Sequence, residues 1–198
     1  MIRRLPFIPT LVVAAAVAVM IALGLWQLMI RAPQKEALVA RYAAAQNLPP
    51  IVFPAEPLRD EALPLYRHAT GTCLRTVGRR VAAGQNRAGE PGYVHIVDCS
   101  TGGERRGMSV ELGWSKNPNA AIAWKGGLVS GVIAPDSKTR MRLVAASAPP
   151  GLESSATPSL DTIPNNHRSY AVQWFAFAAI ALTIYGLAVS KRLKERPQ

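Results

Sequence analysis

The sequence predicts a membrane α+β protein, in which two transmembrane helices flank a periplasmic, antiparallel β-rich domain that forms a small sheet or barrel. Three observations support this fold class: an apolar run near each end of the chain, positive charge beside each run, and a strand-like middle. The runs, residues 5–30 and 169–190, contain no charged side chain. A bilayer core of about 30 Å requires about 20 apolar helical residues, and both runs are long enough.

The positive charge at the chain ends predicts the orientation of the two spans. Short cytoplasmic segments are rich in Lys and Arg, and the tails 1–4 and 191–198 both follow this rule if both are cytoplasmic. The main domain then lies in the periplasm, and the protein is a two-pass protein of a bacterial inner membrane. A cleaved signal peptide is the alternative for the first run, but that run exceeds the usual length of about 7–15 apolar residues.

A helix and a proline-rich connector are expected after the first span, together covering residues 31–64. Pro33 suits the first turn of a helix over residues 33–47. Prolines recur through residues 48–64 and exclude a regular helix or a central strand there. This stretch is therefore expected to be an extended connector.

The β-rich domain is expected over residues 65–147, and a Pro- and Ser-rich return linker over residues 148–168. Short segments bounded by Gly, Pro, Asn or Ser are typical of strands. No helical pattern separates them, which favours an antiparallel sheet or small barrel. The expected strands are Tyr66–Val77, Tyr93–Cys99, Gly107–Gly113, Ala120–Trp124, Leu128–Ile133 and Arg140–Ala146.

The net charge of +11 does not indicate nucleic-acid binding. The basic residues of the middle segment are scattered and are not interleaved with aromatic side chains. Anionic lipid headgroups account for the basic tails, so the lipid bilayer is the expected partner of that charge. The sequence shows no nucleophile elbow, phosphate loop or paired carboxylates in a structured context, and we expect the protein not to be an enzyme.

Cys73 and Cys99 are the two cysteines of the chain, and three states are open for them. Both fall on expected strands in an oxidising compartment, which favours a disulfide. Two unlinked core thiols are the second state. His95 shares a strand face with Cys99, so a copper site made by Cys73, His95 and Cys99 is the third.

Two glutamines lie just inside the expected membrane boundary. Gln27 precedes the end of the first span, and Gln173 follows the start of the second. An amide in lipid seeks a hydrogen-bond partner, and an interhelical bond contributes about 0.6 kcal/mol. We therefore expect Gln27 and Gln173 to join the two spans, with contact to a client subunit as the alternative.

Two sequence motifs lie at the expected membrane edges of the two spans. The motifs are Leu23-Gly-Leu-Trp-Gln27 at the end of the first span and Ile163-Pro-Asn-Asn-His-Arg-Ser-Tyr-Ala-Val-Gln-Trp-Phe175 at the start of the second. Between them lie the glycine-containing positions Gly71, Gly92-Tyr93 and Gly113-Trp114. These motifs and their order resemble those of the Surfeit locus family of cytochrome c oxidase assembly proteins.

This resemblance implies an assembly factor for haem–copper cytochrome c oxidase. Its implied partners are the large catalytic subunit or its assembly intermediate, with the haem a synthesis machinery as a further one. The implied cofactor is haem a, bound transiently and then inserted into the large subunit, with His167 as the candidate ligand of the haem iron. Two other functions stay open: a cofactor-free scaffold or accessory subunit that binds an assembly intermediate, and a periplasmic copper handler.

His167 also has a case from the residues themselves. It lies in the first turn of the second span, after Asn165 and Asn166, which are favoured helix caps. A neutral imidazole binds iron, and the positive end of a helix favours the neutral form. Tyr170 and Trp174 follow on one helical stripe able to shelter a macrocycle, and Arg168 is expected to meet its propionates. The alternative is an interfacial histidine whose stripe packs on the first span.

Overall fold

The computed structural model describes residues 6–54, 56, 58–102 and 107–195. The chain divides into two compact units: Met1–Val39 together with Ile163–Gln198, and Ala40–Thr162. The expected cytoplasmic tail at residues 1–4 lies outside the described residues, as do the last three residues of the C-terminal tail.

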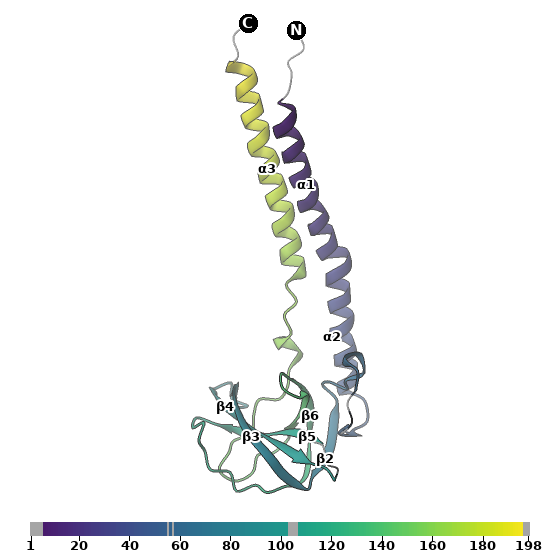
Figure 1. Cartoon of the computed structure of the whole chain (residues 1–198), viewed down its shortest axis with the longest axis vertical. Coiled ribbons are helices and arrows are strands. Elements are labelled where there is room, and N and C mark those ends of the chain that lie inside the picture. The colour runs from purple at the N-terminus through teal and green to yellow at the C-terminus, as the bar shows by residue number, and fades with distance from the viewer. Residues whose placement is uncertain (1–5, 55, 57, 103–106, 196–198) are drawn as a thin grey trace. The chain divides into compact units, whose positions relative to one another are not determined.

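The first unit is a helical hairpin. Helix α1 (Phe7–Trp26) continues through a π-helical segment, η1 (Gln27–Arg31), into α2 (Ala32–Gln46), and α3 (His167–Glu195) returns beside α1 (Figure 1). The helices containing α1 and α3 are long and apolar enough to cross a membrane. Pro33 lies in the first turn of α2, as the sequence predicted.

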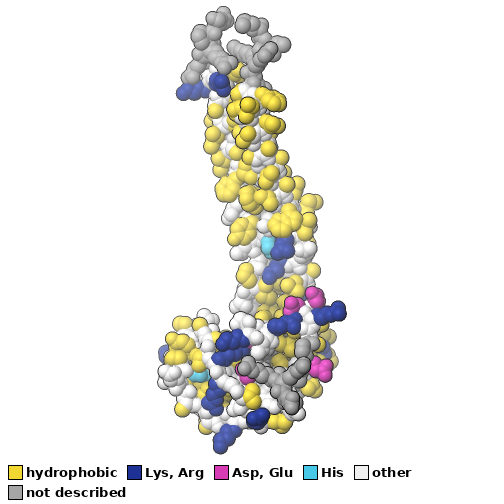
Figure 2. Space-filling view, in the orientation of Figure 1, with side chains coloured by type: hydrophobic (Ala, Val, Ile, Leu, Met, Phe, Trp, Pro, Cys, Tyr) yellow, Lys and Arg dark blue, Asp and Glu magenta, His cyan; other side chains and the backbone are white. Residues whose placement is uncertain are grey.

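Small side chains allow α1 and α3 to pack closely. A Cβ atom added to Gly24 would lie 2.6 Å from the ring of Phe175. Val17 on α1 and Ala171 and Ala178 on α3 are buried. Apolar side chains cover the outer surface of the pair (Figure 2), which suits helices whose outer faces contact lipid.

The second unit contains a seven-stranded sheet with the order β1-β2-β6-β7-β5-β4-β3. Sequence analysis located five of these strands to within a few residues and missed most of β3. The strands are β1 (Ile51–Val52), β2 (His68–Cys73), β3 (Arg75–Gln85), β4 (Pro91–Ser100), β5 (Met108–Ser115), β6 (Gly127–Asp136) and β7 (Arg140–Ala145).

The sheet is mixed, so the expectation of a wholly antiparallel sheet was wrong. Strand β7 pairs antiparallel with β6, to which it is joined by a short turn. It also pairs parallel with β5, because it inserts between β6 and β5. Strand β1, from the proline-rich connector, adds a second parallel pair at the edge beside β2.

Leu74 separates two strands where the sequence predicted one over residues 66–77. On one side of it, Cys73 pairs with Gly127 of β6, and on the other, Arg75 pairs with Ser100 of β4. The chain therefore passes directly from β2, the second strand in the order, to β3 at the opposite edge, and the sheet must curl toward a barrel. The strand continues to Gln85 because β4 pairs with it along this whole length.

The strand expected at Ala120–Trp124 is absent, and this prediction was wrong. The segment has no regular structure. Its carbonyl groups at Ile122 and Trp124 accept hydrogen bonds from the guanidinium of Arg79, at 2.9 and 3.3 Å. A side chain thus satisfies the backbone groups that a neighbouring strand would otherwise bind.

Strands β4 and β5 form the centre of the core. Trp114 is 1% exposed, and its ring lies against Gly92, where an added Cβ would be 2.6 Å away. Gly71 faces Met108 in the same way, with 2.6 Å between the added Cβ and Sδ. These glycines, which the sequence motifs singled out, are therefore positions of close packing.

Candidate functional site at the start of α3

His167 is the first residue of α3, as predicted from the asparagines before it. The backbone N–H of Tyr170 donates to the carbonyl of Asn166 at 3.0 Å, which closes the first turn. The His167 side chain is half-buried. It is thus held at the start of a long helix and remains partly accessible.

The imidazole of His167 contacts α1's end through one ring nitrogen. Its Nδ1 lies 2.8 Å from Oε1 of Gln27. An amide oxygen only accepts hydrogen bonds, so Nδ1 carries the proton in this contact. In the neutral ring the lone pair then lies on Nε2, which makes no hydrogen bond with any described residue.

Arg168 forms an ion pair that sequence analysis did not predict. Its guanidinium donates to Oε1 of Glu36 on α2 at 2.8 Å. The Arg168 side chain is 73% exposed, so the remaining guanidinium N–H groups are accessible to an anion. No local sequence pattern pointed to this pair, because Glu36 and Arg168 are 132 residues apart in the sequence.

The aromatic stripe on α3 faces outward. Tyr170 and Phe177 are 49% and 53% exposed, whereas the packing face toward α1 carries Ala171 and Ala178. Trp174 is half-buried and makes an edge contact with Phe177, with ring centroids 6.3 Å apart. Packing on the first span therefore does not account for Tyr170 and Phe177.

The expected pairing of Gln27 with Gln173 was wrong. Gln27 does join the two helices, but its partner is His167. Gln173 is exposed and makes no hydrogen bond with the residues that the structure describes. The sequence predicted how far along each apolar helix Gln27 and Gln173 lie. It did not predict the direction in which each side chain points around its helix.

Cys73 and Cys99 form a disulfide, with Cα atoms 5.2 Å apart. It joins β2 to β4 across the point where the sheet curls. Neither sulfur is then free to bind copper, which removes the Cys73, His95 and Cys99 site. The imidazole of His95 lies 2.8 Å from the hydroxyl of Ser115, and burial lowers its pKa.

A network of charged residues inside the β domain was missed by sequence analysis. The Asp136 carboxylate accepts hydrogen bonds from Arg80 at 2.8 Å, from the Thr139 hydroxyl at 2.7 Å, and from Arg142 at 3.2 Å. Arg142 also donates to buried Glu111 at 2.7 Å. Burial alone would raise the pKa of Asp136, but the bonds from Thr139 and Arg80 lower it to about 2. The network stabilises the fold.

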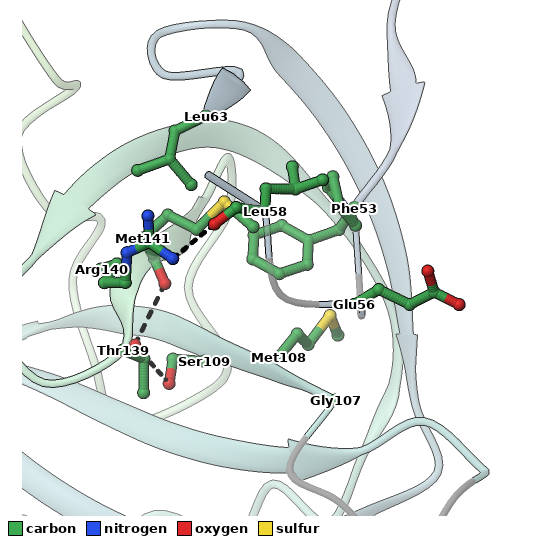
Figure 3. Close-up of a pocket in the computed structure, with 11 residues that line it drawn as sticks. Phe53, Glu56, Leu58, Leu63, Gly107, Met108, Ser109, Thr139, Arg140 and Met141 are labelled. Carbon is green, nitrogen blue, oxygen red and sulfur yellow. Dashed lines mark hydrogen bonds between the residues drawn. The ribbon is translucent and has the colours of Figure 1, made fainter. Parts of the chain in front are cut away.

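A cavity of about 240 Å³ opens near β5 and β7 (Figure 3). Several of its polar members are bonded within the protein: the Thr139 hydroxyl, which donates to Asp136, also lies 3.0 Å from the Ser109 hydroxyl, and Arg140 bonds Asp60 and the carbonyl of Leu58. Phe53 and Met108 make its wall apolar. Among the described residues, no group of three or more His, Cys, Asp or Glu is arranged to hold a metal ion.

The start of α3 is thus the place where a half-buried histidine, an accessible arginine and exposed aromatic rings come together. Both membrane-edge motifs meet here, because Gln27 ends the first and His167 lies within the second. The sequence indicated that the two motifs lie close together, because each was expected at the same edge of the membrane.

Comparison with known proteins agrees with the family that these motifs indicated. The model of the SURF1 family matches residues 14–179, which include most of α1, every strand and the first part of α3. No curated protein sequence matches the chain. The SURF1 family is associated with the assembly of cytochrome c oxidase and is not a known enzyme family. The chain belongs to the SURF1 family.

Proposed function

We propose that this protein is a two-pass assembly factor of a bacterial inner membrane, which binds haem a transiently at His167 and assists its insertion into the large oxidase subunit. The family supports the oxidase as the client. The observation that carries the haem proposal is the His167 ring, whose Nδ1 is held by Gln27 while Nε2 keeps its lone pair.

The residues around His167 fit a haem group. Nε2 is the nitrogen that would ligate the iron, which a bound haem would supply. Tyr170, Trp174 and Phe177 present aromatic surface on the outer side of α3, where a flat macrocycle is able to lie. Arg168 has exposed N–H groups beyond its bond to Glu36 and would pair with the propionates.

The hairpin supports the proposed topology. The hydroxyl groups of Thr10, near the start of α1, and of Tyr185, in the second half of α3, are hydrogen-bonded, so the first turns of α1 lie beside the C-terminal half of α3. Lys191, Arg192 and Lys194 follow at that end. Under the positive-inside rule this end is cytoplasmic, and the β domain is then periplasmic. Such a placement suits a disulfide-bonded domain.

The proposed partners follow from this arrangement. Haem a would arrive from the membrane-bound synthesis machinery and leave to the large subunit of the oxidase. A transient carrier needs a site open to both, and the exposed aromatic face of α3 provides it.

The experiment is an absorption spectrum of the full-length protein, purified in detergent from cells able to make haem a. We expect His167→Ala to insert and fold like the wild type, but to lose bound haem and to lower the yield of active oxidase. His167→Met should keep part of the haem, because a thioether also ligates iron.

His68→Ala is the matched control, since His68 is an exposed histidine on β2 in the other unit. It should bind haem like the wild type. If His167→Ala also binds haem like the wild type, His167 is not the ligand of the iron. If the wild type itself carries no haem, a cofactor-free scaffold becomes the better function.

A further inference from the structure

The helix that carries Gln27 has an irregular turn at this residue. Segment η1 begins at Gln27, and the backbone N–H of Ala32 donates to the Gln27 carbonyl five residues earlier, as in a π-helix. Neither Pro nor Gly occurs between Gln27 and Arg31 to cause it. A π-helical turn inserted in an α-helix often marks a functional position.

The wide turn keeps one face of this helix directed at α3. Gly24 meets Phe175, Gln27 bonds His167, Ala32 is 2% exposed, and Glu36 bonds Arg168. The steps between these positions are three, five and four residues, and the step of five spans η1. A regular α-helix has 3.6 residues per turn and would rotate the later positions away from this face.

Glu36 and Gln27 hold different parts of α3's first turn. Glu36 binds the guanidinium of Arg168, which is mostly exposed. Gln27 binds the ring of His167 itself, at Nδ1. A partner on the second ring nitrogen fixes both the tautomer and the direction of a metal-ligating histidine.

We infer that Gln27 is a positioning residue, which keeps the proton of His167 on Nδ1 and so presents Nε2 as the nitrogen that ligates iron. This inference rests on the proposed haem function, but its first half concerns the haem-free protein. The Gln27 amide oxygen accepts from Nδ1, and the opposite tautomer would place a lone pair against that oxygen.

The first experiment measures the tautomer without haem. The full-length protein, labelled with ¹⁵N-histidine and prepared haem-free in detergent, is compared with Gln27→Leu and Gln27→Glu by nitrogen chemical shifts. A His167→Ala sample assigns the signal. We expect a protonated Nδ1 in the wild type and in Gln27→Glu, because both side chains accept a hydrogen bond. Gln27→Leu should shift the population toward protonated Nε2.

The second experiment titrates the same proteins with haem a. Loss of such a partner typically weakens metal binding about tenfold or more, and we expect this loss for Gln27→Leu. Gln27→Glu should restore binding and lower the reduction potential of the bound haem, because a carboxylate makes the imidazole a stronger donor. Gln173→Leu is the matched control and should bind like the wild type.

Two results would overturn the inference. One is an unchanged tautomer in Gln27→Leu, which would reduce Gln27 to a helix contact. The other is equal loss of haem in Gln27→Leu and Gln173→Leu. If instead the tautomer shifts as expected while His167→Ala binds haem normally, His167 is not the ligand of the iron and the proposed haem site fails, whereas the positioning of the ring by Gln27 stands. Should Gln27→Leu not accumulate, Gln27→Asn tests the same contact with a shorter amide that does not reach Nδ1.

Discussion

The β domain and the helical hairpin bury polar side chains in different ways. In the β domain, Asp136 accepts hydrogen bonds from Arg80, Thr139 and Arg142, which come from separate strands and a turn. In the hairpin, His167 has one side-chain partner, Gln27, and uses one ring nitrogen for it.

The number of partners distinguishes a polar side chain that stabilises the fold from one that is able to bind a ligand. A buried carboxylate with several donors has little capacity left for a ligand, and removing Asp136 takes an ion-pair partner from both Arg80 and Arg142. An imidazole fixed at one nitrogen keeps a lone pair at the other. The comparison therefore favours the hairpin for the candidate chemistry, although the cavity described above and most of the charged side chains lie in the β domain.

The largest expected effect comes from breaking the β-domain network. Asp136→Ala removes the carboxylate and leaves Arg80 and Arg142 without it, which should destabilise the protein by about 3–5 kcal/mol. Denaturant unfolding of the full-length protein in detergent measures this. Asp60→Ala is the control, because Asp60 forms an exposed pair with Arg140 and should cost at most about 1 kcal/mol. Equal effects would show that the network is not structural.

The same carboxylate predicts a pH dependence. The pKa of Asp136 is lowered from 3.8 to about 2 in the folded protein. Its contribution to stability is therefore complete above about pH 4 and is lost as the pH falls toward about 2. The Asp136→Asn variant should show a flatter stability profile over this range. A profile with the wild-type slope would contradict the assignment to Asp136.

The disulfide is expected to give the next largest effect. Its cysteines are 26 residues apart in sequence, and replacing both by serine should lower the free energy of unfolding by about 3 kcal/mol. Reduction of the wild type should lower it similarly and leave the double variant unchanged. Quantitative labelling of both thiols in protein isolated from cells without prior reduction would show that the bridge does not form.

Disrupting the close packing between α1 and α3 should cost less stability than losing the disulfide. Gly24→Leu places a side chain against Phe175 and should destabilise the α1–α3 contact by about 1–3 kcal/mol, since overpacking forces the helices apart. Gly186→Leu is the matched control, because an added Cβ there meets no described atom within 4 Å. Helix separation, measured by spin labels on α1 and α3, should change only for Gly24→Leu.

The smallest effect distinguishes the two glutamines. Gln27→Leu removes an interhelical hydrogen bond and should cost about 0.6 kcal/mol. Gln173→Leu should change stability by less than about 0.5 kcal/mol, because Gln173 is exposed. A larger loss for Gln173→Leu would mean that this amide has a partner in the bilayer, such as a client helix.

The sequence by itself determined the features that depend on local composition. The apolar lengths of the two runs predicted helices able to span a membrane, and Pro33 predicted the start of the helix after the first run. Segments bounded by Gly and Pro located β4, β5, β6 and β7 closely. The membrane-edge motifs identified the family, and His167 was found at the start of α3.

Only the tertiary structure decided which residues meet. The partner of Gln27 depends on the rotation of two helices about their axes, and the π-helical turn changes that rotation in a way no residue type indicated. The insertion of β7 beside β5 and the pairing of Arg80 with Asp136 depend on contacts between distant segments. Local sequence determines how long a helix is, which of its segments are apolar and where turns fall. The register of paired strands and the rotation of packed helices follow only from packing the whole chain.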